Sequence, residues 1–216
     1  MRVMRLLTAI AALALAGLAA LLVWHTSVPG EPPAATEPAS APSEPPAAQP
    51  RGRLPVEDEQ WTTRFDDHFR KYSKRFFSVA FDWRWFKAQG ITESGLRVDA
   101  TSWVGARGIM QIMPATFQEI AELSSLPLSD TEDPAQNIAA GVFYDRRLYD
   151  LWDDIPDRRQ RLAFAFASYN GGRSRTLRAQ DRCPSECAQW TNVQAYVPEE
   201  TRNYVVKIMR LMAADL

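Results

Sequence analysis

Apolar side chains recur at helical spacing through most of this chain, and this pattern limits the folds open to it. Within residues 56–216, apolar positions repeat three or four residues apart, as they do along one face of a helix. No stretch alternates apolar and polar residues with period two, as a half-buried strand would. The chain is therefore predicted to form an all-α domain of roughly 160 residues, which is large enough to bury a core.

Six helices are expected, and capping or helix-breaking residues mark where they begin and end. Asp82 suits the N-cap of the second helix, Pro114 the first turn of the third, and Asp133-Pro134 the start of the fourth. Gly171-Gly172 is expected to end the fifth helix. The six segments are residues 61–76, 82–93, 114–123, 133–152, 157–169 and 198–214.

Residues 1–24 are predicted to target the chain to a membrane. Arg2 and Arg5 precede an apolar run, Leu6–Trp24, which as a helix would span roughly 28 Å, about the thickness of a bilayer's hydrocarbon core. That length favours an uncleaved signal anchor over a signal peptide, although small residues such as Gly17 would also allow cleavage. With both arginines on the cytoplasmic side, the rest of the chain is predicted to lie in the periplasm.

Residues 25–55 are rich in proline and alanine. Such a segment cannot bury enough apolar surface to fold, so it is predicted to be a semi-stiff linker that reaches up to about 90 Å. The folded domain is then expected to occupy residues 56–216, tethered to the inner membrane by the N-terminal helix.

Charge and histidine content argue against two classes of function. The chain has 25 Lys and Arg against 26 Asp and Glu, whereas nucleic-acid binders usually carry a strong basic excess. The only histidines are His25 and His68, which makes a four-ligand zinc site with the two cysteines hard to assemble. No nucleic-acid partner, no metal and no other cofactor is therefore expected.

Cys183 and Cys187 are the only cysteines, and three residues separate them. In an oxidising compartment such a pair can close a small disulfide, which agrees with the predicted export of the domain. Two free, unreactive thiols are the alternative, and the sequence leaves both open.

Glu93 is the strongest candidate for a catalytic residue. Together with Phe86 and Gly90 it falls on the core-facing stripe of the predicted second helix, at the carboxyl end. Burial and the negative pole of the helix dipole both raise the pKa of a carboxyl group placed there. A carboxyl that keeps its proton near neutral pH can act as a general acid. The alternative is an ordinary solvated glutamate, the commoner state of this residue type.

The loop after this helix suits close contact with a ligand. Gly105 and Gly108 permit conformations and approaches that other residues would block. Gln111 can both donate and accept hydrogen bonds, as recognition of an acetamido or hydroxyl group requires. The phosphate-binding pattern G-x-x-x-x-G-K-[ST] is absent from this loop, so nucleotide binding is not expected.

Four ordered motifs resemble those of the soluble-lytic-transglycosylase (SLT) type of lytic murein transglycosylases. They are Glu93-Ser94 with Ser102-x-x-Gly105-Ala106-x-Gly108-x-Met110-Gln111-x-Met113-Pro114-x-Thr116; Pro134, Asn137, Ile138, Gly141 and Tyr144; Ala165-x-Ala167-Ser168-Tyr169-Asn170-Gly171-Gly172; and Pro198-Glu199-Glu200-Thr201-Arg202-x-Tyr204-Val205. Ser168 and Gly171 stand where that family usually has alanine. The resemblance implies a goose-type lysozyme-like fold.

The resemblance also implies a reaction on peptidoglycan glycan strands. Protonated Glu93 would donate to the oxygen of the β-1,4 bond between N-acetylmuramic acid and N-acetylglucosamine. Ionised Glu93 would then accept the proton of the C6 hydroxyl as that hydroxyl attacks C1, which gives a 1,6-anhydro product. Most glycosidases use two carboxylates instead. Asp99 would be the second carboxylate of a lysozyme-type hydrolase, one alternative; a catalytically silent peptidoglycan-binding module is another.

Further residues receive a role from the same resemblance. The residues expected to line the glycan groove are Ser102, Gln111, Tyr169, Asn170 and Tyr204. A cluster of arginines follows the third motif: Arg173, Arg175, Arg178 and Arg182. This cluster is interpreted as a solvated loop, with peptide-stem carboxylates or anionic lipid head groups as alternative partners.

Overall fold

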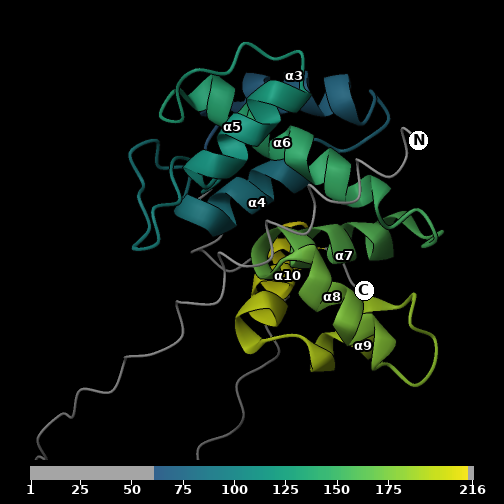
Figure 1. Ribbon diagram of the computed structural model, residues 1–216. Coiled ribbons are helices and arrows are strands. Elements are labelled where there is room, and N and C mark those ends of the chain that lie inside the picture. The colour runs from purple at the N-terminus through teal and green to yellow at the C-terminus, as the bar shows by residue number, and fades with distance from the viewer. Residues whose placement is uncertain (1–60, 214–216) are drawn as a thin grey trace, which may run out of the picture.

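The computed structural model describes residues 61–213, and these residues form an assembly of helices (Figure 1). Within this range no β-strand forms, and only isolated bridges join Thr101 to Arg107 and Arg107 to Ile112. The elements are α3 (Asp66–Phe76), α4 (Arg84–Ser94), α5 (Pro114–Leu123), α6 (Pro134–Asp150), α7 (Arg158–Gly171), α8 (Arg173–Asp181), α9 (Trp190–Val193), the 3-10 helix η2 (Gln194–Tyr196) and α10 (Glu199–Leu211). The prediction of an all-α domain is confirmed for this part of the chain.

The helices lie in two groups, α3 to α6 in one and α7 to α10 in the other (Figure 1). The most extensive packings between the groups are those of α6 against α7 and of α4 against α10. The core between them is aromatic and aliphatic, and its largest fully buried side chains include Phe69, Phe86, Trp152, Phe164 and Trp190. The joint between the groups therefore brings the carboxyl end of α4 near α7 and α10.

The predicted residues open α5 and α6, whereas the N-cap of α4 is Trp83 and not Asp82. The Asp133 side chain accepts a hydrogen bond from the Gln136 backbone N–H (2.8 Å), and Pro134 is the first residue of α6. Pro114 likewise opens α5. Asp82 accepts from the Arg84 backbone N–H (3.0 Å) at the start of α4. These contacts satisfy N–H groups that the first helical turn leaves without a partner.

Three further details of the predicted helices are wrong. Trp61 and Phe65 belong to the approach to α3, which begins at Asp66, and Trp152 lies beyond the end of α6. The arginine cluster is largely a helix, α8, and not a loop. The buried residues of α8 are Thr176 and Ala179, so this helix has almost no apolar stripe for a periodicity argument to detect.

The predicted membrane segment Leu6–Trp24 and the linker 25–55 lie outside the described residues. Among residues 61–213, no helix is long and apolar enough to cross a membrane.

Candidate active site

Glu93 lies at the carboxyl end of α4, as predicted, and the helix continues one residue further, to Ser94. The helix stops directly after it because Gly95 adopts a left-handed conformation (φ 65°), with its N–H bonded back into the last turn. Ser94 is buried, and its hydroxyl donates to the Ile109 carbonyl (2.9 Å). This bond ties the end of α4 to the loop that follows. Glu93 itself keeps part of its surface accessible, so it can reach a ligand.

The environment of Glu93 favours the protonated carboxyl. Burial raises the pKa of Glu93 to about 8, and the Glu200 charge acts in the same direction. The Tyr204 hydroxyl donates to Glu93 Oε1 at 2.5 Å, and this bond together with the Lys207 charge lowers the pKa. Because burial is the largest effect, Glu93 holds its proton at neutral pH. The interpretation of Glu93 as a fully solvated glutamate does not fit this environment.

The loop between α4 and α5 is held by its own backbone and by one buried asparagine. Asn137 on α6 accepts from the Met110 N–H (2.8 Å) and donates to the carbonyls of Arg107 (3.0 Å) and Thr131 (2.9 Å). Gly108 (φ 73°) lies so close that a Cβ there would come within 2.5 Å of the Asn137 side chain. Glycine is therefore required at this position both for its conformation and for its size.

Ser102 and Gln111 hold the same loop. The Ser102 hydroxyl accepts from the Ala106 N–H (2.9 Å). The Gln111 amide donates to the carbonyls of Ala100 (3.1 Å) and Gly108 (2.9 Å), and Gln111 has a positive φ of 45°. Both side chains thus have structural roles that the sequence did not reveal. Their contact with a glycan stays a prediction.

Tyr169 and Asn170 on α7 and Tyr204 on α10 tie separate parts of the fold together, and Tyr204 contacts Glu93 directly. The Tyr169 hydroxyl donates to the Met110 carbonyl (2.8 Å), which links α7 to the loop. The Asn170 side-chain oxygen accepts from the Thr201 hydroxyl (2.9 Å), which links α7 to α10. The pKa of Tyr169 and that of Tyr204 are raised, first by burial and then by the charge of Glu93. Two of the predicted residues, Tyr169 and Tyr204, therefore lie near Glu93, whereas the contact of Asn170 is with Thr201.

Two polar residues of this region were missed by the sequence reading. Gln89 on α4 and Asp145 on α6 are both buried, and Gln89 Nε2 donates to Asp145 Oδ1 at 3.1 Å. The Glu93 charge is among the causes that raise the pKa of Asp145, so Asp145 lies near the candidate acid. The signal that could have drawn attention to Asp145 is its helical spacing from Ile138 and Val142, which places a carboxyl on the apolar stripe of that helix.

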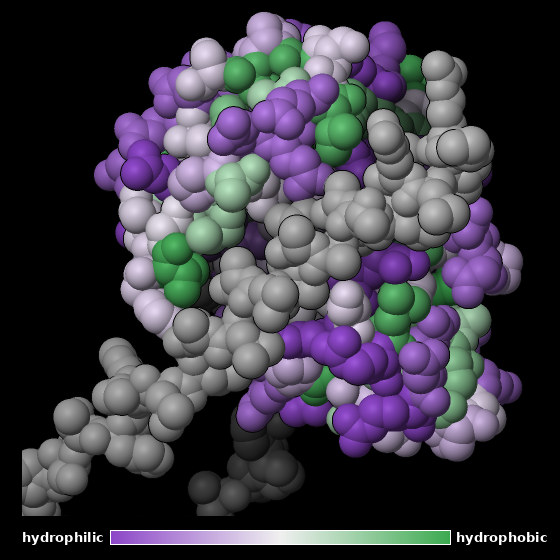
Figure 2. All heavy atoms as spheres, viewed as in Figure 1, coloured by the Kyte–Doolittle hydropathy of each residue, from purple (hydrophilic) through white to green (hydrophobic). Residues whose placement is uncertain are grey.

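The remaining predicted residues lie as follows. Asp99, the candidate second carboxylate, is exposed in the loop after α4. Cys183 and Cys187 are both free thiols, and Cys187 Sγ donates to the Cys183 carbonyl (3.0 Å); the disulfide stays a prediction. Arg178 and Arg182 are exposed at α8, where the face seen in Figure 2 is mainly hydrophilic.

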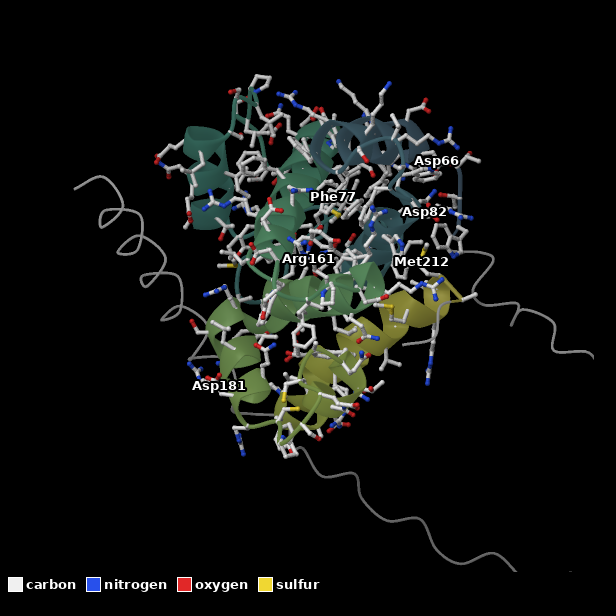
Figure 3. All side chains as sticks on the ribbon, turned by 90° about the vertical axis from the view of Figure 1, so that its right-hand side faces the viewer. Asp66, Phe77, Asp82, Arg161, Asp181 and Met212 are labelled. Atoms are coloured by element: carbon white, nitrogen blue, oxygen red, sulfur yellow. The ribbon has the colours of Figure 1, made fainter. Side chains whose placement is uncertain are left out.

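A hollow of about 520 Å³ lies away from Glu93. Asp82 and Met212 line it and are close together in Figure 3. Arg84 and Trp85, at the amino end of α4, also line it, whereas Glu93 is at the carboxyl end of that helix. This hollow is therefore separate from the Glu93 site.

Comparison with known proteins places this geometry in a family. The Transglycosylase SLT domain profile matches residues 78–189. Membrane-bound lytic murein transglycosylase F of Desulfosudis oleivorans is 40% identical over 100 residues, which are 46% of this chain and 21% of that protein. The protein of the same name from Vibrio cholerae is 31% identical over 179 residues, covering 73% of this chain and 30% of the relative. The chain thus spans less than a third of the length of these two relatives.

Solved structures give the same fold. The 70 kDa soluble lytic transglycosylase of Escherichia coli matches with a TM-score of 0.61 and 25% identity, over 73% of this chain and 25% of that one. An inactive glutamate-to-glutamine mutant of lytic transglycosylase Slt from Pseudomonas aeruginosa matches with a TM-score of 0.62 and 23% identity, over 71% and 24% of the two chains. The matched profile covers slightly more than half of the chain, and residues 61–213 therefore contain the fold that this profile describes: the chain belongs to the Transglycosylase SLT domain family.

Proposed function

We propose that this chain is a peptidoglycan lytic transglycosylase that cleaves the β-1,4 bond between N-acetylmuramic acid and N-acetylglucosamine. The observation that carries the proposal is the position of Glu93 at the end of α4, where burial raises its pKa to about 8 and the Tyr204 hydroxyl donates to Oε1. A pKa near the working pH lets one group act first as an acid and then as a base. Membership of the SLT family supports the same reaction and substrate.

Glu93 performs both proton transfers in this proposal. Its proton passes to the glycosidic oxygen as the bond from that oxygen to C1 breaks. The carboxylate then takes the proton of the C6 hydroxyl while the hydroxyl oxygen bonds to C1, which closes the 1,6-anhydro ring. Since the nucleophile belongs to the substrate, its effective concentration is very high and no second carboxylate is needed. The exposed position of Asp99 gives no support for a hydrolase with two carboxylates.

Tyr204 and Lys207 assist the second transfer. Both lower the pKa of Glu93, because the hydroxyl donates to Oε1 and the ammonium group is positively charged. They therefore stabilise the carboxylate that forms when the first proton has left. Ser102, Gln111, Tyr169 and Asn170 are proposed to border the glycan groove. The first three hold its shape through bonds to backbone groups, and Asn170 does so through its bond to the Thr201 hydroxyl.

We place the enzyme at the periplasmic face of the inner membrane, held there by residues 1–24, or in the periplasm if that segment is cleaved. The apolar run Leu6–Trp24 supports this location, as do the relatives that are named membrane-bound. Residues 25–55 then act as the spacer between membrane and cell wall.

Digestion of purified sacculi tests the proposal. Mass spectrometry should find 1,6-anhydro ends with the unaltered protein and almost none with Glu93→Gln, while Glu93→Gln still binds the sacculi. Products with reducing ends in place of anhydro ends would identify a hydrolase. Equal lysis by the two proteins would instead refute catalysis by Glu93, and no lysis by either protein would favour a binding module.

A further inference from the structure

Gln89 and Asp145 form an isolated polar pair in the core behind Glu93. Gln89 is fully buried and Asp145 is 1% exposed. Gln89 lies four residues before Glu93, and therefore on the same face of α4. The pair connects α4 to α6 through the 3.1 Å bond from Gln89 Nε2 to Asp145 Oδ1.

Each partner has one oxygen without a hydrogen bond. Asp145 Oδ2 and Gln89 Oε1 are both buried and unpartnered. An amide oxygen and both oxygens of an ionised carboxylate can only accept hydrogen bonds. Two acceptors cannot satisfy each other, but a protonated carboxyl supplies the missing donor.

An ionised Asp145 would be costly at this position. Among the described residues no Lys or Arg forms an ion pair with it, and a single amide donor does not replace the solvation that a buried carboxylate loses. Burial, and after it the charge of Glu93, raises the pKa of Asp145 well above its ordinary value, while the Gln89 hydrogen bond lowers it. Asp145 therefore holds its proton more tightly than a solvated aspartate does.

Other charged groups on the surrounding helices do not offset this effect. The titratable groups that the Asp145 charge reaches are Tyr144, Tyr169 and Tyr204, whose pKa values are raised, so they stay uncharged at neutral pH. Charged residues on the surrounding helices include Lys71 and Arg75 on α3, Arg146 and Arg147 on α6, and Lys207 on α10. Lys71, Arg75 and Lys207 are exposed, and Arg146 pairs with Asp150 at 2.6 Å. Glu93 is the one charge that acts on Asp145. Two carboxylates so close together would repel one another.

We propose that Gln89 and Asp145 form a neutral acid–amide pair, with Asp145 donating from Oδ2 to Gln89 Oε1, and that this pair positions Glu93 without placing a second charge beside it. The second bond completes the pair, so that every oxygen of the two groups has a partner. By fixing α4 against α6, the pair sets where the end of α4 presents Glu93 to Tyr204. The positioning role rests on the proposed function of Glu93, whereas the neutral state of Asp145 does not.

The neutral state has a test that needs no enzyme activity. In the unfolded chain Asp145 ionises near pH 4, while in the folded protein it keeps its proton. The unfolding equilibrium constant of the unaltered protein should therefore rise tenfold per pH unit relative to that of Asp145→Asn, or about 100-fold from pH 5 to pH 7. Asp99→Asn is the matched control, because it removes an exposed carboxylate. A ratio that is independent of pH would overturn the neutral pair.

A direct measurement covers the case in which Asp145→Asn does not fold. In the unaltered protein labelled at aspartate carboxyl carbons, the NMR signal of Asp145 should keep the chemical shift of a protonated carboxyl from pH 5 to pH 7. A carboxylate shift in that range would refute the proposal.

The positioning role is tested with the apolar pair Gln89→Met with Asp145→Leu, which fills similar space without hydrogen bonds. We expect it to fold, with kcat on sacculi at least tenfold lower and KM within threefold, whereas Asp145→Asn keeps kcat within threefold. Full kcat in the apolar pair would show that the native pair only fills space. Loss of kcat in Asp145→Asn with an unchanged fold would show that the carboxyl proton itself is needed. That result would overturn the proposal that Asp145 acts as a neutral hydrogen-bonding group, which an amide can replace. If Glu93→Gln proved fully active, the proposed function would fail while the neutral-state result still stood.

Discussion

Glu93→Gln should abolish turnover and at the same time stabilise the fold. In the unfolded chain the carboxyl titrates near its ordinary pKa of 4.5, whereas in the folded protein the pKa is about 8. At pH 7 the folded protein must keep a proton that the unfolded chain releases, over a difference of 2.5 pH units. This difference corresponds to about 3 kcal/mol of lost stability. Solvent reduces this effect because Glu93 is partly accessible, so we expect Glu93→Gln to raise the free energy of unfolding by about 1–3 kcal/mol.

The direction in which the stability difference between the two proteins changes with pH shows whether Glu93 is protonated in the folded protein. A group whose pKa is raised on folding contributes most below the unfolded pKa, and this contribution is lost as pH rises towards the folded pKa. The advantage of Glu93→Gln should thus be small at pH 5 and grow by about 1–2 kcal/mol at pH 7, as measured by urea unfolding. Glu122→Gln, at an exposed carboxylate on α5, corrects for the loss of one charge. An advantage that stays constant or shrinks would mean that Glu93 is ionised at neutral pH, and general acid catalysis by Glu93 would be ruled out.

Four further outcomes are expected. Turnover of sacculi should fall above about pH 8, tenfold per pH unit, because protonated Glu93 is lost; a rate that rises there contradicts the assignment. Tyr204→Phe removes a hydrogen bond that lowers the pKa of Glu93, so the pH at which turnover begins to fall should rise by roughly half to one unit. A downward shift of that pH would refute the role of Tyr204 in lowering the pKa. Gly108→Ala should lower the free energy of unfolding by about 2–4 kcal/mol. The control is Gly105→Ala, because Gly105 also has a positive φ but open space around the added Cβ. An equal loss of stability in both variants would show that the clash with Asn137 is not the cause. Trp103, which is 77% exposed on the loop after α4, offers a sugar-stacking face, so Trp103→Ala should raise KM about three- to tenfold at constant kcat. An unchanged KM for glycan strands would remove that indole from the binding surface.

Local signals predicted most of the fold. Amphipathic stripes and caps were enough to locate α3, α4, α5, α6, α7 and α10, because these features depend on residues within one or two turns. Two short helices, α8 and α9, were missed. The first buries only Thr176 and Ala179, and the second is four residues long. Neither carries enough apolar residues for a periodic pattern to stand out.

The candidate site could be predicted only in part. Glu93 was found because its helix stripe and the following glycines are local features. Its hydrogen bond to Tyr204 joins residues 111 positions apart, and the bond between Gln89 and Asp145 spans 56 positions. Side-chain pairs at such separation leave no periodic signal, since the packing of whole helices brings them together. The structural roles of Ser102 and Gln111 were missed for a similar reason, because backbone partners depend on the loop conformation.

The pKa of Glu93 results from opposing effects, and both are needed for the proposed reaction. Burial alone would leave the carboxyl unable to ionise, and then it could not take the proton of the C6 hydroxyl. Tyr204 and Lys207 lower the pKa, so that the carboxylate is accessible once the first proton has left. A charged Asp145 would act against them by repelling that carboxylate, whereas a neutral one leaves their effect intact. An uncharged Asp145 therefore lets Glu93 ionise when the reaction needs its carboxylate. In this way the polar pair of Gln89 and Asp145 in the core is linked to the proton transfers of Glu93.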